Sequence, residues 1–364
     1  MKLSKRSWLI VAITLALAIF GCVMVFSASM YQANYRYGDS AFFLKKQIFG
    51  VVLGVFGMGF FAWFDYHKLA KLKWIILAVT AVLLVLVFIP GIGVESYGAK
   101  RWVNFLGISI QPSEIAKFAL VIFLASFLSE NHDKIKSFKG LLIPLAVAGI
   151  LCLLVIIEPS MSVTMCIAFV TFFMLIAGGI SKKHTIMFSC MAGACVPLLI
   201  IAEPYRLKRL FAFIDPWASP LGEGYQLIQS LYSLGDGGLF GVGLFNSRQK
   251  YMFLPFAESD FIFSIIGEEL GLFGGIILIL VFITLGYFLI RTGLNAKDRF
   301  GAFLCTGIAF VILIQTALNI AVVTGSIPPT GLPLPFISSG GTSVAVFMTA
   351  IGIALNVDRQ SRKK

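Results

Sequence analysis

The chain has 364 residues, of which 59% are hydrophobic and 13% are charged, and it carries a formal net charge of +12. Soluble domains are about 45–50% apolar, so this composition excludes an ordinary soluble protein and indicates an integral membrane protein. The positive charge does not indicate nucleic-acid binding, because the basic residues lie in short loops between apolar stretches.

About ten apolar stretches recur along the sequence, each long enough to cross a hydrocarbon core ~30 Å thick as a helix. We therefore expect an all-α fold, a polytopic membrane protein of about ten transmembrane helices that form a single domain over residues 1–364. A large extracytoplasmic loop, at about 204–259, separates helices seven and eight. The expected spans are 8–28, 44–64, 74–90, 112–128, 140–157, 160–180, 185–203, 260–290, 300–324 and 335–357.

The basic residues predict the orientation of these helices. With the N-terminus inside, 18 of the 29 Lys and Arg residues fall in the tails and loops on that side, as the positive-inside rule expects. Both termini are therefore expected in the cytoplasm. A cleaved signal peptide is the competing interpretation of the first stretch, but that stretch spans about 20 residues and its removal would break the charge alternation.

The cysteine and histidine positions argue against two kinds of site. All six cysteines lie inside apolar stretches, which disfavours a disulfide framework in the outer loops. All three histidines fall on the cytoplasmic side in this topology. No His-based metal site is therefore expected on the outer face.

Two groups of ionisable residues follow the third helix. Lys100 and Arg101 stand beside Trp102 in an outer loop, where they either anchor the loop at the lipid headgroups or bind substrate. Glu114 and Lys117 are three residues apart on one face of helix four, near its outer end. Ionisable groups at membrane depth usually face a partner or a wet cavity, so this pair either forms a structural ion pair or lines a substrate cavity.

Helices four, six and ten begin at the outer surface with Pro and Ser in their first turns, which suit helix starts. The free N–H groups and partial positive charge at such ends can hold phosphate, although the same residues also simply cap the helices. Convergence of these ends would form an anion-binding basin. Its basic residues would be Lys100, Arg101, Arg206, Lys208, Arg209, Arg248 and Lys250.

Residues 205–271 interrupt the apolar pattern with a polar, Gly-rich segment. The glycine cluster at 235–243 fits neither the dinucleotide fingerprint nor the phosphate-binding loop, and no organic cofactor is expected. Residues 226–234 form an amphipathic segment that we expect at the membrane surface.

Helix eight carries both a small-residue strip and a pair of acids. Gly267, Gly271 and Gly275 stand at four-residue intervals, a spacing that allows close contact with another helix. Glu268 and Glu269 suit either a proton or cation pathway or a hydrogen-bonded structural role.

Asp260 and Glu258 are the acids at the mouth of helix eight. One interpretation of Asp260 is a helix N-cap, for which Asp is favoured, although Ser259 would serve equally well. The other is a general base that takes a proton from a sugar hydroxyl while a phosphate leaving group departs. The helix dipole would lower the pKa of Asp260, whereas burial against Phe261 and Phe263 would raise it, so the residues alone leave both interpretations open.

Several motifs become recognisable together. They are Gly-Ala-Lys-Arg-Trp at 98–102, Gln-Pro-Ser-Glu-Ile-Ala-Lys at 111–117, Pro-Trp at 216–217, Gly-Tyr-Gln at 224–226, Gln-Ser-Leu at 229–231, Asp-Phe-Ile-Phe at 260–263, Gly-Glu-Glu-Leu-Gly at 267–271, Pro-Leu-Pro-Phe at 333–336 and Gly-Gly at 340–341. In this order and over nearly the whole chain, the sequence resembles the SEDS family (shape, elongation, division, sporulation). The strings at 266–271 and 322–325 are more similar to its division and sporulation branch (FtsW) than to its elongation branch (RodA).

The resemblance implies a ten-helix peptidoglycan glycosyltransferase that polymerises lipid II on the outer face of the bacterial plasma (inner) membrane. It also implies a class B penicillin-binding protein and other divisome proteins as partners, in septum synthesis during division or sporulation. Asp260 matches the family's essential loop acid and is implied to be catalytic. The substrate-binding residues expected around it are Lys100, Arg101, Glu114, Lys117, Gln226, Gln229, Ser230, Arg248, Lys250 and Ser338.

The chain departs from the family pattern near this expected site. Where the family has Glu-Pro-Asp-x-Gly, this chain has Ser160 in place of the second acid. The family's Leu-Pro-Glu-x-His-Thr becomes Leu-Pro-Phe-Ala-Glu-Ser at 254–259, and its Ser-Tyr-Gly-Gly becomes Ser-Ser-Gly-Gly at 338–341. These changes concern the acceptor contacts and leave Asp260 in place.

A divalent cation at Asp260 would need oxygen ligands, because no histidine is expected outside, and this favours magnesium or manganese. Two other functions suit ten helices with intramembrane Glu and Lys. One is a transporter that flips lipid II or another polyprenyl lipid, and the other is a non-catalytic division scaffold that docks through the glycine strip of helix eight.

Overall fold

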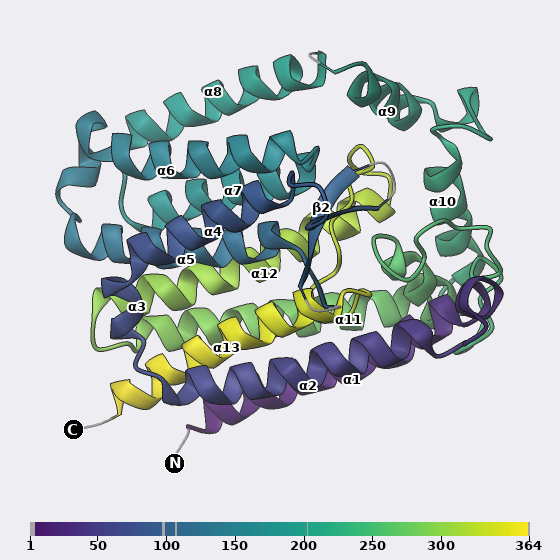
Figure 1. The fold of residues 1–364 in the computed structure, drawn as a ribbon, viewed down its shortest axis with the longest axis horizontal. Helices are drawn as coiled ribbons and strands as arrows, with labels where there is room; N and C mark the ends of the chain where they lie inside the picture. Colours follow the sequence, from purple (N-terminus) through teal and green to yellow (C-terminus); the bar gives the residue numbers. More distant parts are fainter. Residues whose placement is uncertain (1–3, 97–98, 106–107, 202, 363–364) are drawn as a thin grey trace.

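The computed structural model describes residues 4–96, 99–105, 108–201 and 203–362 as a bundle of long helices (Figure 1). Short helices and a small sheet cover one end of the bundle. The helices are α1 (Lys5–Tyr37), α2 (Phe42–Trp63), α3 (His67–Lys71), α4 (Lys73–Leu86), α5 (Pro112–Glu130), η1 (Lys134–Lys136), α6 (Phe138–Ile157), α7 (Met161–Ala177), α8 (Lys182–Ile201), α9 (Pro204–Ile214), η2 (Pro216–Ala218), α10 (Tyr225–Gly237), α11 (Ile262–Leu294), α12 (Arg299–Val323) and α13 (Gly341–Ser361). The strands are β1 (Gly93–Ser96), β2 (Ala99–Phe105) and β3 (Ile108–Ile110).

Each of the ten expected spans corresponds to one helix of the bundle, so the chain is an all-α, multi-pass membrane protein. Among the described residues, seven helices are long and apolar enough to cross a membrane, and α4 and α7 are shorter apolar helices. The last span starts later than expected, at Gly341 rather than near 335. Proline lacks a backbone N–H, and the four prolines between 328 and 335 keep that segment out of a helix.

The outer loop after α4 contains a three-stranded antiparallel sheet in the order β1-β2-β3, which was not predicted from the sequence. Val103 of β2 pairs with Gly93 on one side and with Ile110 on the other. Its side chain is buried, so the sheet has one packed face. The sheet leads directly into α5 and carries Arg101 to the turn between α6 and α7.

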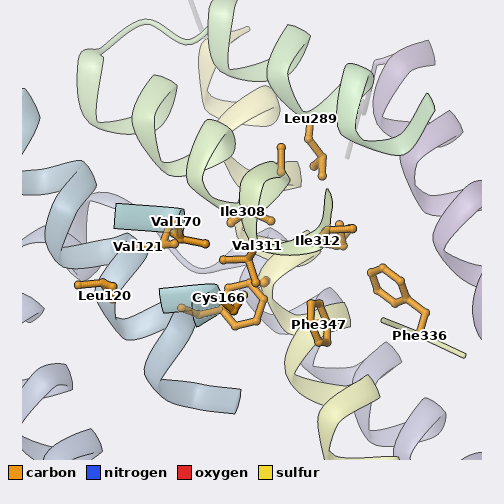
Figure 2. Close-up of a cluster of buried hydrophobic side chains, with 14 of the residues drawn as sticks. Leu120, Val121, Cys166, Val170, Leu289, Ile308, Val311, Ile312, Phe336 and Phe347 are labelled. Carbon is orange, nitrogen blue, oxygen red and sulfur yellow. The ribbon is translucent and has the colours of Figure 1, made fainter. Parts of the chain in front are cut away.

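The core of the bundle lies where α5, α7, α12 and α13 meet (Figure 2). Val121 of α5, Val170 of α7, Val311 of α12 and Phe347 of α13 are completely buried there. A Cβ atom at Gly307 would lie 2.5 Å from the Val121 side chain, so α5 and α12 approach each other closely at this glycine. Because α5 is buried along most of its length, the charged residues in its first turns lie inside the protein.

The two ends of the bundle are formed by different segments of the chain (Figure 1). Both termini lie at one end beside α3, whereas the sheet, α9 and α10 lie at the other. Helices α2, α5, α7, α11 and α13 all begin at the end with the sheet. The predicted site residues therefore share one end of the molecule.

The amphipathic segment at 226–234, which was expected at the membrane surface, is part of a helix that packs on the bundle. This helix, α10, packs against α11 and buries Leu227 and Ile228. A Cβ atom at Gly237 would lie 2.0 Å from the carbonyl oxygen of Gly267. The amphipathic pattern thus reflects burial against the helix that begins just after Asp260.

Candidate active site

Asp260 lies in the turn that leads into α11 and is not its N-cap, which is Phe261. Its backbone carbonyl accepts a hydrogen bond of 2.8 Å from the side-chain amide of Asn319 on α12, and that amide also donates to the carbonyl of Leu332. A Cβ atom at Gly331 would be 2.8 Å from Oδ2 of Asp260. The carboxyl group is therefore held between the start of α11 and the proline-rich segment that precedes α13.

Ser338 holds the same segment from the other side. Its hydroxyl donates to the carbonyl of Ser259 at 2.6 Å and accepts from the backbone N–H of Leu334 at 2.7 Å. The next N–H, that of Ser339, donates to the carbonyl of Glu258 at 2.8 Å. The predicted residue Ser338 thus orients the backbone beside Asp260.

Two arginines place positive charge near Asp260. Burial raises the pKa of Asp260 to about 6, while the charges of Arg101 and Arg209 act to lower it. Arg209 of α9 donates to the carbonyl of Pro329 at 3.3 Å, and Arg101 of β2 donates to the carbonyl of Glu158 at 3.2 Å. A carboxylate with a pKa near 6 is mostly ionised at neutral pH and still accepts a proton readily, which suits a general base.

Glu114 and Lys117 form an ion pair of 2.7 Å, with side chains 1% and 0% exposed. Glu114 also accepts from the Ser343 hydroxyl at 3.0 Å. Lys117 donates to the side-chain oxygen of Gln315, whose amide nitrogen donates to the carbonyl of Pro333 at 2.8 Å. The pair therefore joins α5 to α12, to α13 and to the proline-rich segment beside Asp260.

Lys250 lies in a second buried cluster rather than beside Asp260. Its fully buried ammonium group is 3.3 Å from Glu269 and 3.5 Å from the hydroxyl of Ser27. Glu268 accepts hydrogen bonds from the Ser247 hydroxyl and from the backbone N–H of Arg248. These contacts anchor the loop after α10 to α11 and α1, and they leave the Arg248 side chain exposed at the surface.

The remaining predicted residues lie on α10 and β2. Gln226 donates to the carbonyl of Pro255 at 3.3 Å, five residues before Asp260, and Gln229 is half-buried on the same helix. The Ser230 hydroxyl is buried against the Val323 carbonyl and the Ser264 hydroxyl. The backbone of Lys100 pairs with β1, and its side chain lies outside the described part of the chain.

Three residues of this site were not predicted from the sequence. Asn319 is a polar residue in an apolar helix, a signal that sequence inspection offers. Gly331 and the backbone carbonyl of Glu158 become relevant only through contacts with residues far away in the sequence, Asp260 and Arg101.

No metal-ligand cluster accompanies Asp260 in the described part of the chain. Within these residues, no group of three or more His, Cys, Asp or Glu side chains could hold a metal ion. Mg²⁺ is often bound by one or two carboxylates together with substrate phosphates, and Asp260 offers one such carboxylate.

Comparison with known proteins adds further information. The sequence pattern of the FtsW/RodA/SpoVE family, described as cell cycle proteins, matches residues 7–363. The chain is 41% identical over 362 residues to stage V sporulation protein E of Bacillus subtilis, covering 99% of each chain. It is 40% identical over 357 residues to a probable peptidoglycan glycosyltransferase FtsW of Trichlorobacter lovleyi, covering 98% of this chain and 94% of that one.

The fold is also similar to solved structures. A chain of a peptidoglycan synthase complex superposes with a TM-score of 0.81 at 24% identity, with 98% of both chains covered. The rod shape determining protein RodA of Thermus thermophilus superposes with a TM-score of 0.72 at 22% identity, again with 98% of both covered. At these identities the structures support the fold alone.

Proposed function

Since the chain belongs to the FtsW/RodA/SpoVE family of cell cycle proteins, we propose that it is a peptidoglycan glycosyltransferase. It polymerises lipid II into glycan strands during septum synthesis in division or sporulation. Its relatives named as probable peptidoglycan glycosyltransferases, at 37–40% identity over almost the whole chain, support this assignment. The single observation that carries it is Asp260, a partly buried carboxyl on which the charges of Arg101 and Arg209 act.

The proposed reaction is an inverting glycosyl transfer. Asp260 takes the proton from the 4-hydroxyl of the acceptor sugar while that oxygen forms a bond to the anomeric carbon of the donor. The bond from this carbon to the polyprenyl pyrophosphate breaks at the same time, and the electron pair leaves with the pyrophosphate. Arg101 and Arg209 lie where their charge acts on Asp260, so they stabilise the negative charge that develops on the leaving group.

Five other predicted site residues have supporting roles in this proposal. Gln226 and Ser338 hold the backbone beside Asp260, and the buried pair of Glu114 and Lys117 supports the proline-rich segment behind it. Lys250 stabilises the outer loop through Glu269. A magnesium or manganese ion at Asp260 would take its remaining ligands from the pyrophosphate and water, and it would supply further positive charge there.

We also propose the setting in which the enzyme works. Both termini lie at one end of the bundle (Figure 1), and the positive charge of the loops at that end supports a cytoplasmic location for it. The site then faces outward from the bacterial plasma membrane, where lipid II meets a class B penicillin-binding protein and other divisome proteins. The similarity to a peptidoglycan synthase complex supports such a partner.

Purified protein supplied with fluorescent lipid II tests this function, with and without the partner penicillin-binding protein. We expect glycan chains on a gel, and we expect Asp260→Asn to abolish them while the protein stays folded. Translocation of lipid II in liposomes without polymer would instead support a flippase.

The non-catalytic scaffold has less support than the enzyme. Its docking face was expected to be the glycine strip of α11, but α10 and the loop after it already cover Gly267 and Gly271 of that strip. Cβ atoms at Gly237 and Gly241 would lie 2.0 Å and 2.2 Å from carbonyl oxygens of Gly267 and Glu269. A partner helix therefore finds this part of α11 occupied.

A further inference from the structure

Glu158, at the turn between α6 and α7, is a buried acid that the proposed mechanism does not use. It is the C-cap residue of α6, and its side chain is 0% exposed. Both of its carboxyl oxygens are buried and have no hydrogen-bond partner in the described part of the chain. A buried ionised carboxylate without partners is very costly, so this group is stable there only as the neutral acid.

Arg101 connects this acid to the catalytic residue. Its Nε donates to the backbone carbonyl of Glu158 at 3.2 Å, and another nitrogen of its guanidinium donates to the carbonyl of Pro159. The guanidinium therefore binds the C-terminal end of α6, where the helix dipole favours a cation. Its charge also acts on the carboxyl of Asp260. One arginine thus lies within electrostatic reach of two carboxyl groups.

One charged group acts on Glu158 in the described part of the chain, and it is Arg101. Burial raises the pKa of Glu158 to about 8, and Arg101 is the charge that acts to lower it. The first turn of α7, from Met161 to Thr164, contains no ionisable side chain. Ser160 also carries no charge, so Glu158 is the one acid of this turn.

We propose that Glu158 is a positioning residue that must stay protonated for the glycosyl transfer, because its ionised form would neutralise the charge of Arg101. With Glu158 neutral, the positive charge of Arg101 acts on Asp260 and on the departing pyrophosphate. When Glu158 loses its proton, the new carboxylate attracts the guanidinium and weakens that stabilisation. This inference rests on the proposed glycosyltransferase function.

The test is the pH dependence of lipid II polymerisation by the full-length protein together with its partner penicillin-binding protein. The wild-type rate should fall above pH 8 and reach about a tenth of its maximum near pH 9, because one group that titrates at about 8 must stay protonated. Glu158→Gln should keep the neutral-pH rate within about threefold and lose this alkaline decline. The matched control is Glu223→Gln, which changes an exposed acid in the outer loop. This variant should show the same alkaline decline in rate as the wild type.

Infrared difference spectra between pH 7 and pH 9 give a second readout that does not depend on activity. The wild type should lose a protonated-carboxyl C=O band at pH 9, and E158Q should lack that change. Glu158→Met is the alternative variant for both measurements should E158Q not fold. An alkaline decline that persists in the variant, or an unchanged infrared band, would overturn the proposal. A wild type without polymer at any pH would refute the glycosyltransferase function, while the infrared result would still report on Glu158.

Discussion

Asp260 combines partial burial with nearby positive charge, and both properties have consequences that can be measured. Its raised pKa of about 6 means that the carboxyl binds a proton in mildly acidic solution. A protonated carboxyl cannot accept the proton of the acceptor hydroxyl. We therefore expect the rate of polymerisation to rise about tenfold per pH unit below pH 6 and to be level between about pH 6 and pH 8.

The ionisation of Asp260 should affect stability and activity in opposite directions, because a rising pH increases the rate but lowers the stability of the fold. Because the folded-state pKa lies above the ordinary value of 3.8, raising the pH from about 4 to 6 ionises this group more readily in the unfolded chain and lowers stability. Asn carries no charge, so Asp260→Asn should melt at pH 7 at a temperature equal to or above that of the wild type. A lower melting temperature would show that the carboxylate stabilises the fold.

Variants of the buried pair Glu114 and Lys117 test whether this pair has a structural or a catalytic role. Lys117→Met leaves a buried carboxylate unpaired and should destabilise the protein by about 3–5 kcal/mol, seen as a lower melting temperature in detergent. Lys45→Met removes an exposed pair with Asp39, whose side chains are 69% and 37% exposed, and should change stability by about 0–1 kcal/mol.

A double variant, Lys117→Met with Glu114→Gln, completes this comparison. It removes both charges and should recover much of the lost stability. Recovered stability with recovered polymerisation would assign the pair a purely structural role. Recovered stability without activity would place the pair in contact with substrate.

The sequence predicted Asp260, Arg101 and Ser338 as site residues, but it did not predict Asn319 or Gly331. The proposed catalytic residue lies in a recognisable local string, Asp-Phe-Ile-Phe at 260–263. Its supports come from α12, from Gly331 and from the turn at Glu158, which are far away along the chain. Lys250 is a residue that was predicted at the site but lies elsewhere. It was expected to bind substrate, and it is instead buried in an ion pair with Glu269.

At the scale of elements, the contact between α10 and α11 fixes the outer loop that leads to Asp260. Two glycines of α10 differ sharply in the space around them. A Cβ at Gly237 would meet the carbonyl oxygen of Gly267 at 2.0 Å, whereas a Cβ at Gly235 would meet nothing within 4 Å. Backbone atoms cannot move aside as a flexible side chain can.

Gly237→Ala should therefore push α10 away from α11, lower the melting temperature and reduce polymerisation. Gly235→Ala is the matched control, and it should stabilise the protein by about 0.5–1 kcal/mol because alanine favours the helix. Limited proteolysis of the loop at 238–259 would report the loosening directly. Equal behaviour of the two variants would contradict the observed packing.

The long helices could be predicted from sequence, because a helix that crosses a bilayer needs a continuous apolar run. The sheet could not, since its strands contain only 4, 7 and 3 residues and carry no extended alternating pattern. The docking of α10 was also missed. An amphipathic pattern shows that one face is buried, but it does not distinguish a lipid surface from a neighbouring helix.

For the whole molecule, the bundle brings distant segments together at one end. The sheet, α9, the turn after α6 and the proline-rich segment each approach Asp260 from a different part of the chain. The opposite end holds both termini (Figure 1). This difference between the two ends suits an enzyme that binds a lipid-linked substrate in the membrane and acts on it at one membrane face.

The most direct test of this account is polymerisation of lipid II by the purified protein together with its partner penicillin-binding protein, with wild type and Asp260→Asn compared at pH 7. We expect long glycan chains from the wild type and a rate lowered by about 10²-fold or more in the folded variant. Polymer formed equally well by the variant would contradict the role of Asp260. Lipid II translocation without any polymer from the wild type would contradict the enzyme assignment itself.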